Sequence, residues 1–247
     1  DILLLICSGL SFLIPSFVLI FNNRSLFKLK IENYQILKKW FYFGAPVSIW
    51  ASMGLMMTYL DRFFINKFYN SEIVGIYSSL NDFTVKLFSF LIFPFTMAIH
   101  PRITKLWNAN KKDIAIDILS KSICSVIILF IIIVFAMILF NDLIINLIKF
   151  ALPMVPSKNA QIYLPLAIAG ILWQLSLIAH KMIELNEKTY IMLIFISFSL
   201  IINIIGNIHF LPRYGIFSTA LASMLSALAY CCLCVFYFYK TRKKLKY

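Results

Sequence analysis

Long apolar stretches run through the chain, and each is long enough to cross the hydrocarbon core of a membrane as a helix. They are continuous, whereas the strands of a membrane barrel alternate apolar and polar residues in segments of about ten. The sequence therefore predicts an all-α, polytopic bundle of about seven transmembrane helices. The predicted spans are residues 2–21, 41–60, 74–100, 122–141, 162–180, 189–208 and 216–239.

The composition excludes a soluble fold of this length. Of the 247 residues 62% are hydrophobic and 13% are charged. Soluble globular domains average about 45–50% apolar and about 25% charged residues. The 23 Lys and Arg outnumber the 10 Asp and Glu, but they lie mostly between the apolar stretches. There they specify membrane topology, and we expect no nucleic acid as a partner.

The basic residues are distributed unevenly over the connections between the predicted spans. Seventeen of the 23 lie in one alternating set of connections, and five lie in the other set. Connections rich in Lys and Arg face the cytoplasm. The sequence therefore predicts a multi-pass protein whose residue 1 lies outside and whose C-terminus is cytoplasmic. The basic set is residues 22–40, 101–121, 181–188 and 240–247.

The sequence lacks the residue patterns of known enzyme chemistry. His100, His180 and His209 stand near predicted span ends without a second metal ligand at a suitable spacing. We expect His100 and His180 to be polar anchors at the membrane interface. The five cysteines lie inside apolar stretches without metal or disulfide spacing, and no phosphate loop or nucleophile elbow is present. We therefore predict no catalytic residue, no metal, no cofactor and a non-enzymatic function.

Two charges, Asp82 and Lys86, lie deep inside the stretch 74–100. Lys86 is twelve residues after Val74, which places it about 18 Å along a helix, near mid-membrane. A lysine at that depth costs about 2.5–3.5 kcal/mol and normally faces a bundle interior or water. Asp82 precedes it by one helical turn, so the two side chains are predicted to pair. The pair is either a structural salt bridge or part of a cavity wall that meets an anionic substrate.

Three polar side chains in the apolar stretches are candidate members of the same cavity wall. Asn81 precedes Asp82, Gln174 lies in the middle of 162–180, and Asn203 lies one turn before Asn207. For any single one of them, a hydrogen-bonding contact between helices is the favoured interpretation. Both interpretations stay open at this point.

Two sequence patterns carry a family resemblance. Phe-Gly-Ala-Pro at 43–46 leads to an Asp-Arg pair at 61–62 and then to Val-Gly-Ile-Tyr-Ser at 74–78. Near the C-terminus, "NIHFLPRYGIFSTA" occupies residues 207–220. These patterns resemble the C-terminal lobe of bacterial polysaccharide transporters. That family comprises the O-antigen and lipid-linked oligosaccharide flippases of the MATE-like superfamily.

Five residues within these patterns are predicted to be structural. Asp61 and Arg62 are expected at the outer end of a span, where charges are tolerated and can cap or pair. Gly75 and Gly215 are expected where a connection re-enters the membrane, because glycine tolerates the backbone turn that re-entry requires. Pro212 belongs to the second pattern and precedes the last span.

The resemblance implies a fold of two lobes around a central cavity. Residues 1–21 would be the last helix of an otherwise missing N-terminal lobe, and 22–40 a basic cytoplasmic linker. Residues 41–239 would form a six-helix C-terminal lobe, and 240–247 a basic cytoplasmic tail. Because the first residue is Asp and not Met, we expect the sequence to be a piece of a longer protein.

The resemblance also implies a function. It indicates a flippase that moves polyprenyl-pyrophosphate-linked oligosaccharide across the bacterial inner membrane for O-antigen, lipopolysaccharide or other surface polysaccharide biosynthesis. The implied partners are that substrate and the lipid bilayer, with other polysaccharide assembly proteins as further candidates. The candidate substrate-binding residues are Lys86, Asp82, Asn81, Gln174 and Asn203.

Three other functions remain open on the sequence alone. A multidrug or cation antiporter of the same superfamily favours acidic groups, which Asp82 supplies, whereas the deep charge of Lys86 favours an anionic substrate. A membrane glycosyltransferase or polysaccharide polymerase needs a catalytic loop or soluble domain, and no connection is long enough for one. A membrane scaffold without transport activity is the third alternative.

Overall fold

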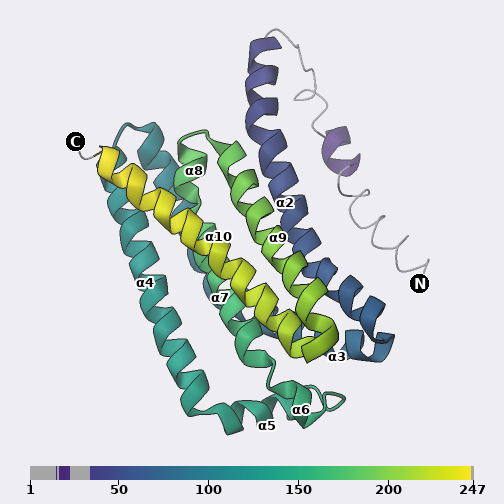
Figure 1. The fold of residues 1–247 in the computed structure, drawn as a ribbon. Helices are drawn as coiled ribbons and strands as arrows, with labels where there is room; N and C mark the ends of the chain where they lie inside the picture. The colour runs from purple at the N-terminus through teal and green to yellow at the C-terminus, as the bar shows by residue number, and fades with distance from the viewer. Residues whose placement is uncertain (1–14, 16, 23–33, 246–247) are drawn as a thin grey trace. The chain divides into compact units, whose positions relative to one another are not determined.

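The computed structural model describes residues 15, 17–22 and 34–245, and within these ranges it contains helices and no strand (Figure 1). The chain divides into two compact units, Asp1–Tyr42 and Phe43–Tyr247. In the first unit, the Lys38 ammonium lies 5.9 Å from the centre of the Tyr42 ring. The second unit contains the described chain from within α2 (Tyr34–Phe68) onward.

The long helices confirm the predicted helix bundle. Helix α2 is followed by α3 (Ser71–Asn108), α4 (Lys112–Leu139), α5 (Asn141–Ala151), α6 (Ser157–Ala160), α7 (Tyr163–Ala179), α8 (Lys181–Leu185), α9 (Thr189–Tyr214) and α10 (Ile216–Leu245). Among the described residues, five segments are long and apolar enough to cross a membrane. They are Ser71–Asn108, Lys112–Leu139, Lys158–Leu185, Thr189–Tyr214 and Ile216–Lys243, and they correspond to the last five predicted spans.

The first two predicted spans have a different outcome. The span 41–60 lies within α2 and is helical, but it is not among the five apolar segments. Glycine and hydroxyl residues dilute its apolar character, and the hydroxyls of Ser52 and Thr58 bond back to carbonyls of their own helix. Most of the span 2–21 and most of the linker 22–40 lie outside the described residues, and the described residues 17–21 of that span are helical. Residues 34–40 of that linker form the first turns of α2.

Helix α7 lies at the centre of the second unit. The segment Lys158–Leu185, which contains α7, buries 72% of its apolar window, against 22–39% in the other four segments. It contacts α3, α4 and α10, and α10 in turn packs along α9 (Figure 1). The buried side chains form two clusters, one joining Ile103, Leu119 and Phe238 and the other joining Ile65, Tyr77 and Leu211. The core therefore extends along the length of the bundle.

Helices α9 and α10 are joined by one residue and approach each other closely. Gly215 ends α9 with φ +70°, a conformation that residues with a Cβ rarely adopt. Further along the pair, a Cβ placed on Gly206 would lie 2.6 Å from the Ala222 Cβ, so glycine is required at this crossing. The two helices form a tight hairpin.

Two hydrogen bonds, one at each end of the bundle, join segments far apart in the sequence. In each case the basic-residue bias assigns both segments to the same side of the membrane. The Tyr69 hydroxyl donates to the Leu211 carbonyl at 3.0 Å, which joins the α2–α3 turn to the α9–α10 turn. At the opposite end, the Arg242 guanidinium donates to the Ser120 hydroxyl at 2.9 Å. The predicted outer turns therefore meet at one end of the bundle and the basic segments meet at the other.

Candidate functional site

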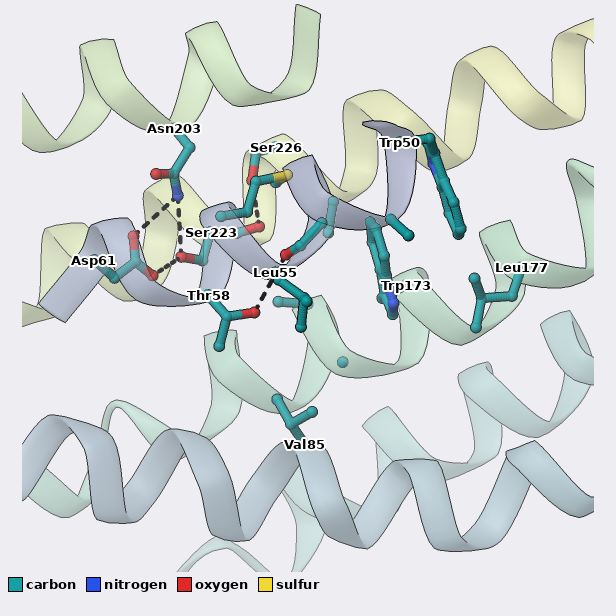
Figure 2. Close-up of a pocket in the computed structure, with 16 residues that line it drawn as sticks. Trp50, Leu55, Thr58, Asp61, Val85, Trp173, Leu177, Asn203, Ser223 and Ser226 are labelled. Carbon is teal, nitrogen blue, oxygen red and sulfur yellow. Dashed lines mark hydrogen bonds between the residues drawn. The ribbon is translucent and has the colours of Figure 1, made fainter. Parts of the chain in front are cut away.

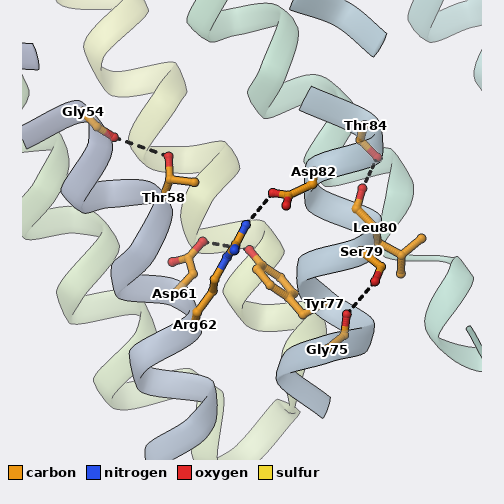
Figure 3. A network of polar contacts seen from close by, with 10 residues as sticks. All are labelled: Gly54, Thr58, Asp61, Arg62, Gly75, Tyr77, Ser79, Leu80, Asp82 and Thr84. Atoms are coloured by element: carbon orange, nitrogen blue, oxygen red, sulfur yellow. Dashed lines mark hydrogen bonds and ion pairs between the residues drawn. The ribbon is translucent and has the colours of Figure 1, made fainter. Parts of the chain in front are cut away.

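Asp61 is the centre of a buried polar network. Its side chain is 4% exposed, although it belongs to the long helix α2. One carboxylate oxygen accepts hydrogen bonds from the amides of Asn203 and Asn207 at 3.1 and 3.0 Å. The other accepts from the hydroxyls of Tyr77, at 2.8 Å, and Ser223 (Figures 2 and 3). The donors come from α3, α9 and α10, so four helices meet at one carboxylate.

The four donors satisfy the Asp61 oxygens without supplying a positive charge. Arg62, the next residue, points to α3 and donates to the Asp82 carboxylate, forming an ion pair (Figure 3). The predicted structural role of Asp61 and Arg62 stays a prediction, and the two adjacent residues contact different partners. A carboxylate removed from water is costly, and at Asp61 four hydrogen bonds offset that cost in place of a positive charge.

A cavity of about 460 Å³ opens beside this carboxylate. Asp61 lies at one end of it, and the indoles of Trp50 and Trp173 lie at the other (Figure 2). The two indoles are parallel, with centres 6.1 Å apart. Among the lining residues, all in the described part of the chain, Asp61 is the only acidic or basic one. The remaining lining residues are Ala51, Gly54, Leu55, Met57, Thr58, Val85, Ala169, Gly170, Leu177, Asn203, Ser223, Ser226 and Ala227.

A second buried polar cluster surrounds His180, next to the aromatic end of the cavity. One ring nitrogen lies 3.2 Å from the Tyr230 hydroxyl, and the other lies 3.3 Å from a Glu184 carboxylate oxygen. The Trp50 ring stands edge-on to the imidazole, 4.9 Å between centres. The prediction that His180 is an interfacial anchor is wrong, because helices α2 and α10 cover it and leave its residue 3% exposed.

The structure separates Asp82 from Lys86. The predicted pairing of these two residues is wrong, because Arg62 reaches across from α2 and occupies the Asp82 carboxylate. Lys86 is exposed, and it forms no ion pair or hydrogen bond with a described residue. The lysine therefore remains available to a partner outside the described residues.

The other three candidate binding residues have different surroundings. Asn203 belongs to the Asp61 network and lines the cavity. Gln174 is buried and donates from α7 to the Ser89 hydroxyl of α3 at 2.9 Å, so it joins two helices. Asn81 is half-buried on α3 and takes no part in the Asp61 network. The structure thus brings only one of the three to the cavity.

The two glycines that were predicted to form backbone turns have different conformations in the structure. Gly215 adopts the positive φ that its predicted role requires. Gly75, in contrast, lies within the first turns of α3, and a Cβ there would meet no atom within 4 Å. The predicted backbone turn at Gly75 is therefore wrong. Pro212 lies in the last turn of α9 and precedes the turn at Gly215.

Several site residues were missing from the sequence-based candidates: Trp50, Tyr77, Trp173 and Ser223. The spacing of Asn203 and Asn207, one helical turn apart, placed both on one face of a helix. Nothing in the spacing identified Asp61 as their partner. Tyr77 belongs to the motif at 74–78, but its hydroxyl contact depends on how α2 and α3 pack.

A helical bundle with apolar spans and a buried carboxylate beside a cavity defines a multi-pass membrane protein. The MatE family profile matches residues 46–209, more than half of the chain, and the protein therefore belongs to the MatE family. No curated protein matches the sequence significantly.

A solved structure has the same fold. It is the outward-facing conformation of a multidrug resistance MATE family transporter of the MOP superfamily, with a TM-score of 0.63 and 12% sequence identity. The match covers 83% of this chain and 45% of that transporter, so the chain spans less than half of the transporter's length.

Proposed function

We propose that the protein is part of a secondary transporter that flips a polyprenyl-pyrophosphate-linked oligosaccharide across the bacterial inner membrane. The translocated oligosaccharide would be used in surface polysaccharide biosynthesis, including O-antigen and lipopolysaccharide assembly. The observation that carries this proposal is Lys86, a cation with no carboxylate partner among the described residues, within a span-forming helix.

The position of Lys86 supports contact with an anion. It lies about 22 Å from the start of α3, too far for its ammonium to reach the polar boundary easily. A lysine facing lipid at that depth is costly, so the exposed surface around it is expected to face water or protein. Since Arg62 occupies Asp82, the ammonium is free to meet an incoming pyrophosphate.

A cation near the middle of the membrane would lower the main energetic barrier to this translocation. A pyrophosphate and polar sugars cannot enter hydrocarbon without losing hydration that nothing replaces. Lys86 does not line the Asp61 cavity, but on a surface that faces water it would offset part of that cost. Movement of one lobe against another would switch the side to which that surface is open. In this proposal Asp61 binds the coupling cation or proton, because its carboxylate has no positive partner among the described residues.

A multidrug or cation antiporter of the same superfamily is the second candidate. One observation favours it: the cavity combines two indole rings with a single carboxylate, a combination that suits an organic cation. The two candidates differ in which charge touches the substrate. Lys86 would do so in a flippase, whereas Asp61 would do so in an antiporter.

The test replaces Lys86 in the full-length protein, in a strain that lacks its own flippase. We expect Lys86→Met to be inserted at normal abundance but to leave surface polysaccharide unrestored, while Lys86→Arg keeps part of the activity. Lys105→Met removes an exposed lysine from the same helix and should behave like the parent. Full restoration by Lys86→Met would refute the flippase assignment, and loss of ethidium efflux in Asp61→Asn would favour the antiporter.

A further inference from the structure

A groove lies between the start of α9 and the end of α10, away from the Asp61 cavity. Its volume is about 590 Å³, within the range of about 300–1,000 Å³ that small-molecule sites occupy. It is lined by Asn186, Lys188, Ile191, Phe195, Leu233, Phe236, Tyr237, Lys240 and Thr241. No acidic side chain is among these residues, which all belong to the described part of the chain.

Charge and apolar surface are separated along this groove. Lys188 immediately precedes α9, and Lys240 lies near the end of α10, so both ammonium groups belong to the end with the basic segments. Further along the same two helices, Ile191, Phe195 and Leu233 provide half-buried apolar surface. The groove is therefore basic at the membrane boundary and apolar toward the membrane interior.

One aromatic ring connects the basic and apolar parts. Phe236 is 64% exposed, and the Lys240 ammonium lies 6.0 Å from the centre of its ring. Long basic side chains at membrane boundaries can lay their alkyl stems on apolar surface and keep the charge in water, and Lys240 beside Phe236 is suited to this. The N-terminus of α9 adds partial positive charge beside Lys188.

We propose that this groove is a binding site for an anionic diacyl phospholipid. The phosphate of the lipid would lie between Lys188 and Lys240, and one acyl chain would lie on Ile191, Phe195 and Leu233. Basic pockets between membrane helices on the cytoplasmic side suit such headgroups, and the basic-residue bias assigns this end to the cytoplasm. A free inorganic phosphate would leave the apolar part of the groove uncovered.

The test measures lipid binding to the full-length protein, purified in detergent, by native mass spectrometry. Phosphatidylglycerol is compared with phosphatidylcholine of the same acyl chains. We expect a preference for phosphatidylglycerol, and we expect Lys188→Gln with Lys240→Gln to weaken its binding by about tenfold or more. Lys111→Gln with Lys112→Gln removes the same charge from the α3–α4 connection and should leave the binding unchanged.

A second variant tests the acyl chain separately from the charge. Leu233→Ser changes a half-buried side chain on which the acyl chain would lie, and we expect it to weaken binding of both lipids while the preference for phosphatidylglycerol remains. Equal weakening by the Lys188/Lys240 and Lys111/Lys112 variants would mean nonspecific attraction to a basic surface and would overturn the proposal. Unchanged binding in the Lys188/Lys240 variant, with an unchanged melting temperature, would overturn it as well.

Discussion

Arg62 and Asp82 form an ion pair between α2 and α3, two helices that are consecutive in the chain. The pair is half-exposed, with side chains 24% and 41% accessible. The pair leaves Lys86 without a carboxylate partner. Lys86 lies one helical turn after Asp82 and could pair with it if Arg62 did not. The exposure of Lys86 therefore depends on a residue of the neighbouring helix.

This relationship predicts an exchange of partners. In the parent protein, Lys86→Met should change the free energy of unfolding little, since the lysine has no described partner. In an Arg62→Gln background, Asp82 is released and Lys86 can take the place of Arg62. There, Lys86→Met should cost on the order of 1 kcal/mol more. Thermal unfolding in detergent measures the four variants, and an equal effect of Lys86→Met in both backgrounds would contradict the exchange.

The Asp61 network predicts a large difference between two substitutions. Asp61→Ala removes the acceptor of four hydrogen bonds, and while the amides of Asn203 and Asn207 keep other acceptors, the Tyr77 and Ser223 hydroxyls lose theirs. We expect a loss of about 1–3 kcal/mol for each hydroxyl left without a partner. Asp61→Asn should be far milder. Its carbonyl oxygen can accept from the two asparagines, and its amide can donate to the two hydroxyls, which rotate to accept.

The melting temperature and the abundance of the protein report this difference. Asp142→Ala removes an exposed acidic group and serves as the control, with an expected change within about 0.5 kcal/mol. A melting temperature of Asp61→Ala equal to that of the parent would show that the carboxylate does not hold the four helices together.

Two glycines in helices predict opposite effects of the same substitution. Gly75→Ala adds a methyl group in open space and should stabilise α3 by roughly 0.5–1 kcal/mol through helix propensity. Gly206→Ala places a Cβ 2.6 Å from that of Ala222, so α9 and α10 must separate. We expect a loss of about 1–3 kcal/mol, the usual cost of overpacking. Thermal unfolding of both variants tests this, and a stabilising Gly206→Ala would refute the close crossing.

The meeting of turns at each end of the bundle predicts the labelling of introduced cysteines. On a background without the native cysteines, Asn70→Cys and Gln161→Cys should react with an impermeant thiol reagent in intact cells. Asn110→Cys should react only after permeabilisation, because the basic-residue bias assigns its connection to the cytoplasm. Labelling of Asn110→Cys in intact cells would reverse the predicted orientation.

The bundle could be predicted from the sequence because each apolar stretch by itself is long enough to specify one membrane-spanning helix. The sequence could not predict where Asp61 points, since an Asp-Arg pair at a span end is equally compatible with a solvated cap. The Asp61 partner Ser223 is 162 residues away and is one of several serines near the start of α10. Such a contact depends on the packing of helices, which hydrophobic patterning within one helix does not encode.

The predicted pair of Asp82 and Lys86 is a second contact that local spacing could not decide. Two opposite charges four residues apart on one helix favour each other only when no better partner is available. Arg62 is that partner, and its planar guanidinium suits a carboxylate better than an ammonium does. The spacing correctly placed Asp82 and Lys86 on one face of a helix. It could not predict that Arg62 of the neighbouring helix α2 pairs with Asp82 in place of Lys86.

The one-residue connection at Gly215 and the close crossing at Gly206 have a mechanical consequence for the Asp61 network. Asn203, Asn207 and Ser223 belong to α9 and α10, which these two glycines allow to lie close together. Asp61 and Tyr77 are carried by α2 and α3, which the Arg62–Asp82 pair holds together. The hydrogen bonds of one carboxylate thus join the α9–α10 hairpin to helices α2 and α3. A change in the charge of that carboxylate would therefore alter the contact between the hairpin and helices α2 and α3 directly.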